Sequence, residues 1–316
     1  MRKIIIGSRS SKLAAVQAEL VLAKLREAVP GLEASIAKIT TKGDGDDNTP
    51  LDNFAQQGIF VKELEKALID GEIDLSVHSL KDLPTQIPAE LSLAAVTTRL
   101  DPRDVLVSRA RKLSELATGS KIGTGSLRRS LQLLALRSDL EIKGIRGNID
   151  TRLRKVSEGE IDGVIVAAAA LIRLGWEGRI TEYLPVEHFM PAVGQGALGI
   201  EIRSKDERTT SLVSRVNHEP TWRCTTAERT FLQSLGGGCR APIAALGVVS
   251  DGALKLSGMV ASADANLILR TTVEGDAQAP EQLGRRLARK MVEMGAVDLI
   301  AEAKASIFPS PSTREC

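Results

Sequence analysis

The sequence contains few of the residues on which several classes of protein depend. Its three cysteines, at positions 224, 239 and 316, are few, odd in number and irregularly spaced, which argues against a disulfide-stabilised scaffold and favours a reducing compartment. We therefore expect a cytoplasmic protein. The three histidines are scattered, and none is spaced from a cysteine as zinc ligands are, so no metal site is expected.

Long hydrophobic runs are also absent. No apolar stretch reaches the ~18 residues that a membrane-spanning helix needs, and the apolar run in the N-terminal MRKIIIGSRS is too short for a signal peptide. Aromatic residues make up 3% of the chain, which leaves few side chains for stacking on nucleic-acid bases, and no nucleic-acid-binding motif is present. We therefore expect neither a membrane nor a nucleic acid as a partner.

Positive charge is concentrated in residues 121–154, where eight basic residues stand against three acidic ones, while the whole chain has a net charge of +2. Ser126 is a candidate helix N-cap and is followed by leucines at helical spacing, which places Arg128 and Arg129 in a first helical turn. The helix dipole disfavours cations there unless an anion lies close by. The stretch is therefore either a solvated basic face or a polyanion site, and the position of the two arginines favours the polyanion site. Because the run GTGSLRR lacks the letters of a dinucleotide fingerprint and of a P-loop, neither nucleotide site is expected.

The order of expected strands and helices indicates three domains. Strands and helices alternate through residues 1–100, and the alternation restarts after the turn DPRD. The last hundred residues predict a helix, three alternating strands and a closing helix that ends near Gly295. We expect a first α/β lobe at 1–98 plus about 195–216, a second α/β lobe at 102–192, and a small C-terminal α+β domain with a three-stranded antiparallel sheet at 218–316.

Two short runs contain candidate reactive groups. In GGGCRAP, three glycines leave the thiol of Cys239 unshielded and Arg240 favours its thiolate, although a structural cysteine beside a flexible helix end is the alternative. In HSLKDLP, Lys81 and Asp82 follow a buried strand. We expect Asp82 to be the only carboxylate among several cations at this sheet edge, and a turn residue before Pro84 is the alternative.

Seven segments together closely resemble one family in their order and spacing. They are GSRSSKLA, GIFVKELEKAL, DLSVHSLKDLP, IGTGSLRR, RGNIDTR, PAVGQGALGIE and GGGCRAP, and they resemble the porphobilinogen deaminase (hydroxymethylbilane synthase) family from about residue 4 to at least 295. The resemblance implies two lobes like those of periplasmic binding proteins and a third domain that presents a cofactor at the cleft.

The resemblance also implies an activity, a transferase of tetrapyrrole and haem biosynthesis. Members join four porphobilinogen molecules head to tail into hydroxymethylbilane and release ammonia each time. A dipyrromethane cofactor primes the reaction through a thioether to the cysteine that matches Cys239, and no metal is implied. Every pyrrole ring has an acetate and a propionate, so the growing chain is a polyanion that suits the arginines. We expect a monomer.

Matching the motifs residue by residue implies a set of roles. Asp82 would be the catalytic carboxylate, which binds pyrrole N–H groups and stabilises the cation formed when ammonia leaves. One position departs from the family, whose members usually have a lysine where this chain has Gln57, so we expect weaker handling of late intermediates. Cofactor side chains would be held by Ser79, Lys81, Thr124, Ser126, Arg128 and Arg129, and the substrate or chain by Arg9, Ser11, Arg146, Arg152, Arg173 and, at the hinge, Gln195.

Two other functions are weaker. A two-lobed anion receptor predicts an export signal, which the sequence lacks, and gives no use for GGGCRAP. Nucleic-acid binding through the basic stretch is disfavoured by the scarcity of aromatic residues. The sequence therefore favours the enzyme.

Overall fold

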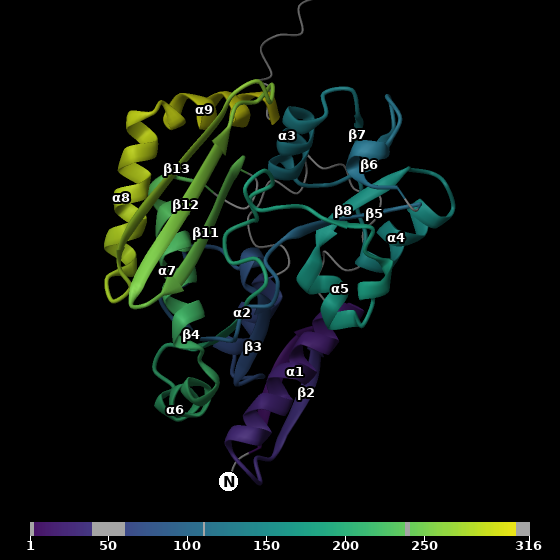
Figure 1. Cartoon of the computed structure of the whole chain (residues 1–316). Helices are drawn as coiled ribbons and strands as arrows, with labels where there is room; N and C mark the ends of the chain where they lie inside the picture. Colours follow the sequence, from purple (N-terminus) through teal and green to yellow (C-terminus); the bar gives the residue numbers. More distant parts are fainter. Residues whose placement is uncertain (1–2, 40–60, 110, 238–240, 308–316) are drawn as a thin grey trace, which may run out of the picture.

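The computed structural model describes residues 3–39, 61–109, 111–237 and 241–307, which form three bodies around three separate sheets. In Figure 1 the first lobe lies below, the second lobe at the upper right, and the body formed by the green and yellow end of the chain at the upper left. The predicted fold class, two α/β lobes and a small α+β domain with a three-stranded antiparallel sheet, is confirmed.

The first lobe contains a five-stranded sheet in the order β2-β1-β3-β10-β4. β1 pairs in parallel with β2 and β3, whereas β10 runs antiparallel to both β3 and β4. Buried residues of α1, such as Val21 and Leu25, pack against apolar residues of the sheet. The strands are β1 (Ile4–Arg9), β2 (Ala34–Ile39), β3 (Leu75–Ser79), β4 (Leu91–Val96) and β10 (Leu198–Arg203), and the helices are α1 (Lys12–Ala28), α2 (Lys62–Ile69) and α6 (Glu207–Val213).

The second lobe repeats this plan, with a sheet in the order β7-β6-β8-β5-β9. β6 pairs in parallel with β7 and β8, and β5 runs antiparallel to β8. The strands are β5 (Asp104–Ser108), β6 (Lys121–Gly123), β7 (Glu141–Lys143), β8 (Gly163–Ala167) and β9 (Glu182–Tyr183), and the helices are α3 (Leu127–Leu136), α4 (Ile149–Ser157) and α5 (Ala168–Leu174). Shorter 3-10 helices lie at Leu80–Asp82, Leu113–Glu115, Glu177–Arg179 and Ser214–Val216.

The two lobes are joined by two adjacent chain segments. The N–H of Leu100 donates to the carbonyl of Gly196 at 3.1 Å, and the N–H of Thr97 donates to the carbonyl of Leu198 at 3.0 Å. A second contact joins the lobes where α1 begins, because the Lys12 ammonium lies 4.8 Å from the centre of the Trp176 ring. The two lobes therefore meet at the joining segments and at the start of α1.

The C-terminal body has β11, β12 and β13 in an antiparallel sheet with α7 and α8 on one face. Alternating side chains serve the two faces: Leu256 packs under Phe231 of α7, while Met259 packs with Leu131 of α3 in the second lobe. The elements are α7 (Glu219–Ser234), β11 (Ile243–Ser250), β12 (Ala253–Ala261), β13 (Ile268–Asp276), α8 (Pro280–Glu293) and α9 (Ala296–Ile307).

The prediction that the chain's last helix ends near Gly295 was wrong, because α9 follows it. Gly295 has a φ of 93° and separates α8 from α9, and the next residues again place apolar side chains on one face. Ala296, Ile300 and Ala303 of α9 are all buried. Gly295 therefore separates two helices and does not end the helical region.

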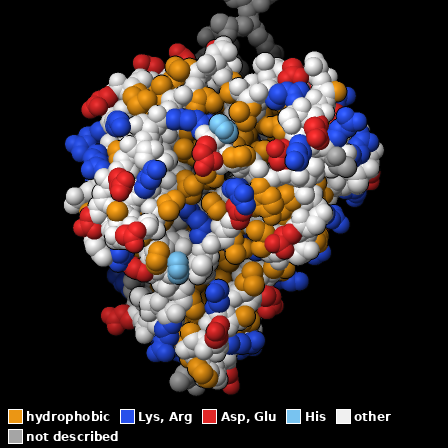
Figure 2. All heavy atoms as spheres, viewed as in Figure 1, with side chains coloured by type: hydrophobic (Ala, Val, Ile, Leu, Met, Phe, Trp, Pro, Cys, Tyr) orange, Lys and Arg blue, Asp and Glu red, His pale blue; other side chains and the backbone are white. Residues whose placement is uncertain are grey.

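On the face drawn in Figure 2, basic and acidic side chains are interspersed and form no single-sign field of the kind that attracts nucleic acids. Within residues 3–39, 61–109, 111–237 and 241–307, none of the helices has both the length and the apolar character to cross a bilayer.

Candidate active site

The turn after β3 presents Asp82 from a well-supported backbone. Residues Leu80–Asp82 form a 3-10 helix whose first N–H donates to the carbonyl of Ala197 at 3.0 Å. Leu80 and Leu83 are 1% and 2% exposed and hold the turn in the core, whereas the Asp82 side chain is exposed. The carboxylate is therefore accessible to a ligand while its backbone is fixed.

Hydroxyl groups of the predicted site serve as local acceptors. Ser11 and Ser126 are the N-caps of α1 and α3, and their Oγ atoms accept from the N–H of residues 14 and 129 at 3.3 and 3.4 Å. The Oγ1 of Thr124 accepts from the N–H of Ser126 at 3.2 Å, and the Oγ of Ser79 accepts from a buried glutamine of α1 at 2.8 Å. Because each contact uses the oxygen as acceptor, each O–H can still donate to an anion.

A second carboxylate lies among the cations, so the expectation that Asp82 is alone there was wrong. Asp104, the first residue of β5, is 0% exposed. Its carboxylate accepts from Arg128 Nη1 at 2.8 Å and from Arg129 Nε and Nη2 at 3.0 and 2.6 Å. Although burial raises the pKa of the Asp104 carboxyl, the two guanidinium groups hold it well below its usual range. Asp104 therefore remains an anion inside the protein.

The two arginines of the first turn of α3 also bind backbone oxygens. Arg128 Nη1 donates to the Met190 carbonyl at 2.6 Å, and Arg129 Nη1 donates to the Ile165 carbonyl at 3.1 Å. Both side chains are buried, at 5% and 6% exposure, and Asp104 supplies an anion next to the helix start. The protein itself thus provides part of the negative charge that the first-turn position indicates.

The rest of the basic stretch behaves differently. Arg137 binds Asp139 with bonds of 2.7 Å, and Lys143 and Arg154 pair with nearby glutamates at the surface. These pairs are solvated or partly solvated, and pairs of this kind contribute little to stability. The interpretation as a solvated face therefore holds for Arg137, Lys143 and Arg154, and the polyanion site at Arg128 and Arg129 stays a prediction.

Gln195 connects the two lobes at the paired segments that join them. It is 1% exposed, and its Nε2 donates to the Pro102 carbonyl at 2.7 Å and to Asp104 Oδ1 at 2.9 Å. Its Oε1 accepts from Lys81 Nζ at 3.2 Å. One amide therefore links the Lys81 turn of the first lobe to the charged cluster of the second.

The pKa values of three cations of this region are lowered, mainly because each side chain is partly removed from water. Burial, with Arg129 nearby, lowers the pKa of Lys81 to about 8. Burial and the same arginine lower the pKa of Arg152 to about 10, and the Asp82 carboxylate opposes this shift. Burial alone lowers the pKa of Arg173 to about 10. A polyanionic ligand would restore these pKa values, so a group with several carboxylates fits this set of donors.

Two of these arginines also donate hydrogen bonds to backbone carbonyls. Arg152 Nε donates to the Gly147 carbonyl at 2.9 Å, and Arg173 Nη2 donates to the Gly196 carbonyl at 2.7 Å. Of the other predicted residues, Arg9 ends β1 and Arg146 lies between β7 and α4, and both are partly buried. Residues 57, 239 and 240 lie outside the described residues.

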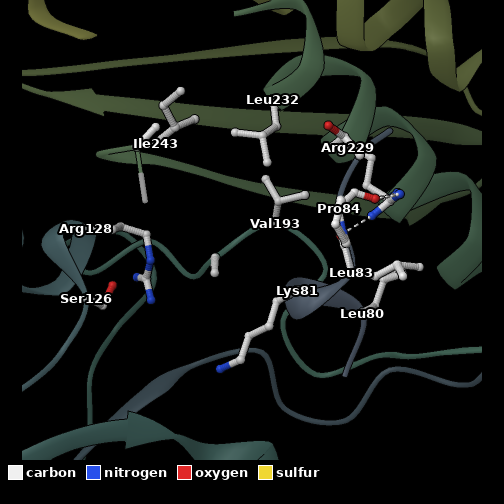
Figure 3. A pocket seen from close by; sticks show the side chains of 13 residues that line it. Leu80, Lys81, Leu83, Pro84, Ser126, Arg128, Val193, Arg229, Leu232 and Ile243 are labelled. Atoms are coloured by element: carbon white, nitrogen blue, oxygen red, sulfur yellow. Dashed lines mark hydrogen bonds between the residues drawn. The ribbon is translucent and has the colours of Figure 1, made fainter. Parts of the chain in front are cut away.

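A cavity of about 70 Å³ lies where the three bodies meet. Figure 3 shows Lys81 and Leu83 of the first lobe, Arg128 and Ser126 of the second, and Arg229 and Leu232 of α7 around it. Ala241, two residues after Cys239 in the chain, also lines this cavity. In the part of the chain that the structure describes, no cluster of His, Cys, Asp and Glu side chains could hold a metal ion.

Three charged residues of this region were missed from the sequence: Asp104, Glu228 and Arg229. Glu228 is 0% exposed and accepts two bonds of 2.8 Å from Arg99, as well as one of 2.8 Å from the Gly194 N–H. An acidic residue on the apolar side of a helix is a weak sequence signal, because its partner lies far away in the chain. Asp104 is the last residue of the DPRD turn, whose letters predict only a domain boundary.

Comparison with known proteins shows the family of this chain. Residues 4–211 match the family model described as "Porphobilinogen deaminase, dipyromethane cofactor binding domain", and residues 222–293 match "Porphobilinogen deaminase, C-terminal domain". The chain is 48% identical to the porphobilinogen deaminase of Alkaliphilus metalliredigens over 95% of both chains. It is 47% identical to that of Bacillus subtilis over 97% of this chain and 98% of the relative.

Among solved structures, an arginine-specific periplasmic binding protein of Salmonella typhimurium is 14% identical, with a TM-score of 0.39 over 68% of this chain and 92% of that one. The two family models together span the lobes and the C-terminal body, and the relatives match over nearly their full length. The chain therefore belongs to the porphobilinogen deaminase family.

Proposed function

We propose that this chain joins four porphobilinogen molecules head to tail into hydroxymethylbilane, with Asp82 as the catalytic carboxylate and a dipyrromethane bound covalently to Cys239. The observation that supports this most strongly is the set of partly buried cations, among them Lys81 and Arg152, beside the exposed Asp82 carboxylate. Four rings with two carboxylates each make a polyanion, and a cleft with several arginines and a lysine is suited to it.

We place the cofactor beside the cavity that Lys81, Ser126 and Arg128 line. We assign its carboxylates to Lys81, Arg128 and Arg129 and to the O–H groups of Ser79, Thr124 and Ser126. When bound, the dipyrromethane supplies the free pyrrole carbon to which the first substrate ring is joined. Because Arg128 and Arg129 already share Asp104, their guanidinium planes are fixed before the cofactor binds. Asp104 therefore prepares the site without contacting the ligand.

We assign the charge-stabilising role in the reaction to Asp82. Its carboxylate accepts pyrrole N–H bonds and stabilises the positive charge that develops on the substrate as ammonia leaves. The same oxygen can accept the proton that the attacking ring loses. The Asp82 carboxylate raises the pKa values of Lys81 and Arg152 against the effect of their burial, so we assign the carboxylate and these two cations to one site.

The substrate and the growing chain are assigned to the cleft between the lobes. Its donors are Arg9, Ser11, Arg146, Arg152 and Arg173, with Gln195 at the hinge. We further propose the domain division 1–98 plus about 195–216, 102–192 and 218–316, which is supported by the pairing of β10 with β3 and β4. A monomer and a cytoplasmic location are proposed as well, the location on the basis of the cysteine content.

Cofactor loading should depend on pH through Lys81. The Lys81 ammonium is charged below its pKa of about 8 and becomes neutral above it, so the attraction for carboxylates is lost as pH rises. We expect the rate at which cofactor-free protein gains dipyrromethane mass to fall above that pH. In Lys81→Arg, which stays charged, the fall should be weaker. Intact mass spectrometry over time measures both, and identical pH profiles for the two proteins would contradict the assignment.

The overall activity is tested by stoichiometry. Purified protein is incubated with porphobilinogen, and ammonia and oxidised porphyrin are measured together. We expect four ammonia molecules per tetrapyrrole from the wild type and no product from Cys239→Ser. Uptake of porphobilinogen without ammonia release would indicate a binding protein instead.

A further inference from the structure

Arg229 of α7 makes two hydrogen bonds to the backbone that directly follows Asp82. Its Nη1 donates to the Leu83 carbonyl at 2.9 Å, and its Nη2 donates to the Pro84 carbonyl at 2.6 Å. Figure 3 draws both as dashed lines between the helix of the C-terminal body and the turn of the first lobe. Hydrogen bonds from a guanidinium are stronger than neutral ones, and two of them fix an orientation as well as a distance.

These bonds to the backbone matter because the Asp82 side chain has no hydrogen bond of its own among the described residues. Within the described residues, the Asp82 carboxylate makes no hydrogen bond, and its side chain is exposed. The position of the carboxylate is therefore set by the backbone of its turn. Leu80 and Leu83 fix that turn from the core of the first lobe, and Arg229 fixes the stretch after it from the C-terminal body.

The helix that supplies Arg229 is itself firmly supported. α7 packs closely on α8 at Gly284, where an added Cβ would lie 2.5 Å from the carbonyl oxygen of Ala227. The preceding residue, Glu228, binds the Arg99 guanidinium with two bonds of 2.8 Å. Two consecutive residues of α7 therefore join the first lobe at two different segments, the Asp82 turn and the first of the two segments that join the lobes.

The same helix leads directly to the proposed cofactor anchor. α7 ends at Ser234, and Cys239 follows a few residues later in the chain. We propose that Arg229 is a positioning residue of the deaminase reaction, which fixes the Asp82 turn relative to the helix that leads to the cofactor cysteine. This inference rests on the proposed function. Any movement of the C-terminal body then moves the backbone of the catalytic carboxylate with it.

The test compares three variants on one helix. Arg229→Met keeps an unbranched, flexible side chain that lacks both donor groups, and Arg229→Lys restores a charged donor. Arg223→Met is the matched control, because Arg223 is also in α7 but binds Glu219 at 3.0 Å near the surface. Each protein is measured for kcat, for KM and for dipyrromethane content by intact mass. This separates positioning from cofactor binding.

We expect Arg229→Met to lower kcat between about 10- and 100-fold, since small misplacements of a catalytic group have effects of this size. Its cofactor mass and its KM for porphobilinogen should remain close to wild type. Arg229→Lys should recover part of the loss, and Arg223→Met should equal wild type. If Arg229→Met fails to fold, the kcat of the Lys variant relative to wild type decides the question.

Two results would overturn the inference. One is an unchanged kcat in Arg229→Met or in the folded Lys variant. The other is a loss of activity that follows a loss of dipyrromethane mass, because Arg229 would then be a cofactor ligand. A wild-type protein without dipyrromethane mass and without turnover would refute the proposed function itself, and so the two failures are distinguishable.

Discussion

Replacing Asp82 with asparagine is expected to lower kcat by about 100- to 10,000-fold, the range for removal of a general acid-base or charge-stabilising group. The amide keeps the size of the side chain but cannot balance positive charge on the substrate. Since Asp82 is exposed, the fold should not change. Steady-state kinetics with porphobilinogen measures kcat, and intact mass shows whether the cofactor is present.

Matched variants separate charge from position. Asp82→Glu keeps the charge and moves it by one methylene, so it should retain more activity than the asparagine variant. Glu90→Gln removes an exposed carboxylate elsewhere in the first lobe and should behave as wild type. If Asp82→Asn loses less than about tenfold in kcat, Asp82 is not the catalytic carboxylate.

The second large effect is on stability. Asp104→Asn leaves the buried guanidinium groups of Arg128 and Arg129 without their anion, so the variant should lose about 3–5 kcal/mol of the free energy of unfolding. It should also load less dipyrromethane, because the two arginines lose their fixed orientation. Urea unfolding measures the first effect and intact mass measures the second.

A partly exposed pair of the same chemistry provides the control. Asp139 binds Arg137 in two bonds of 2.7 Å at the surface, and Asp139→Asn should leave the unfolding midpoint nearly unchanged. If the two aspartate variants unfold at the same urea concentration, the ion pairs of Asp104 with Arg128 and Arg129 do not stabilise the folded protein. Normal loading in Asp104→Asn would show that the arginines need no internal anion.

Local sequence signals predicted the elements of this fold well. Ser126 caps α3 as its position before the leucine-rich run indicates. This feature depends on residues close together in the chain. α9 was missed because Gly295 was interpreted as an end, although a glycine also serves to separate two helices.

Contacts between distant segments could not be predicted in the same way. Asp104 meets Arg128 only because β5 runs beside β8 near the start of α3, and nothing in the letters DPRD specifies this partner. Arg229 binds the carbonyls of Leu83 and Pro84, which are 146 and 145 residues away in the chain. Because every residue has a backbone carbonyl, the sequence does not indicate which one accepts such a bond. The roles of Gln195 and Cys239 came from the family resemblance and not from residue patterns.

The intact mass of the purified protein, compared with that of Cys239→Ser, tests the central claim most directly. The account predicts that the wild type exceeds its sequence mass by two linked pyrrole units and that the serine variant has the sequence mass alone. A wild-type protein that has only its sequence mass, and that keeps it after incubation with porphobilinogen, would contradict the account.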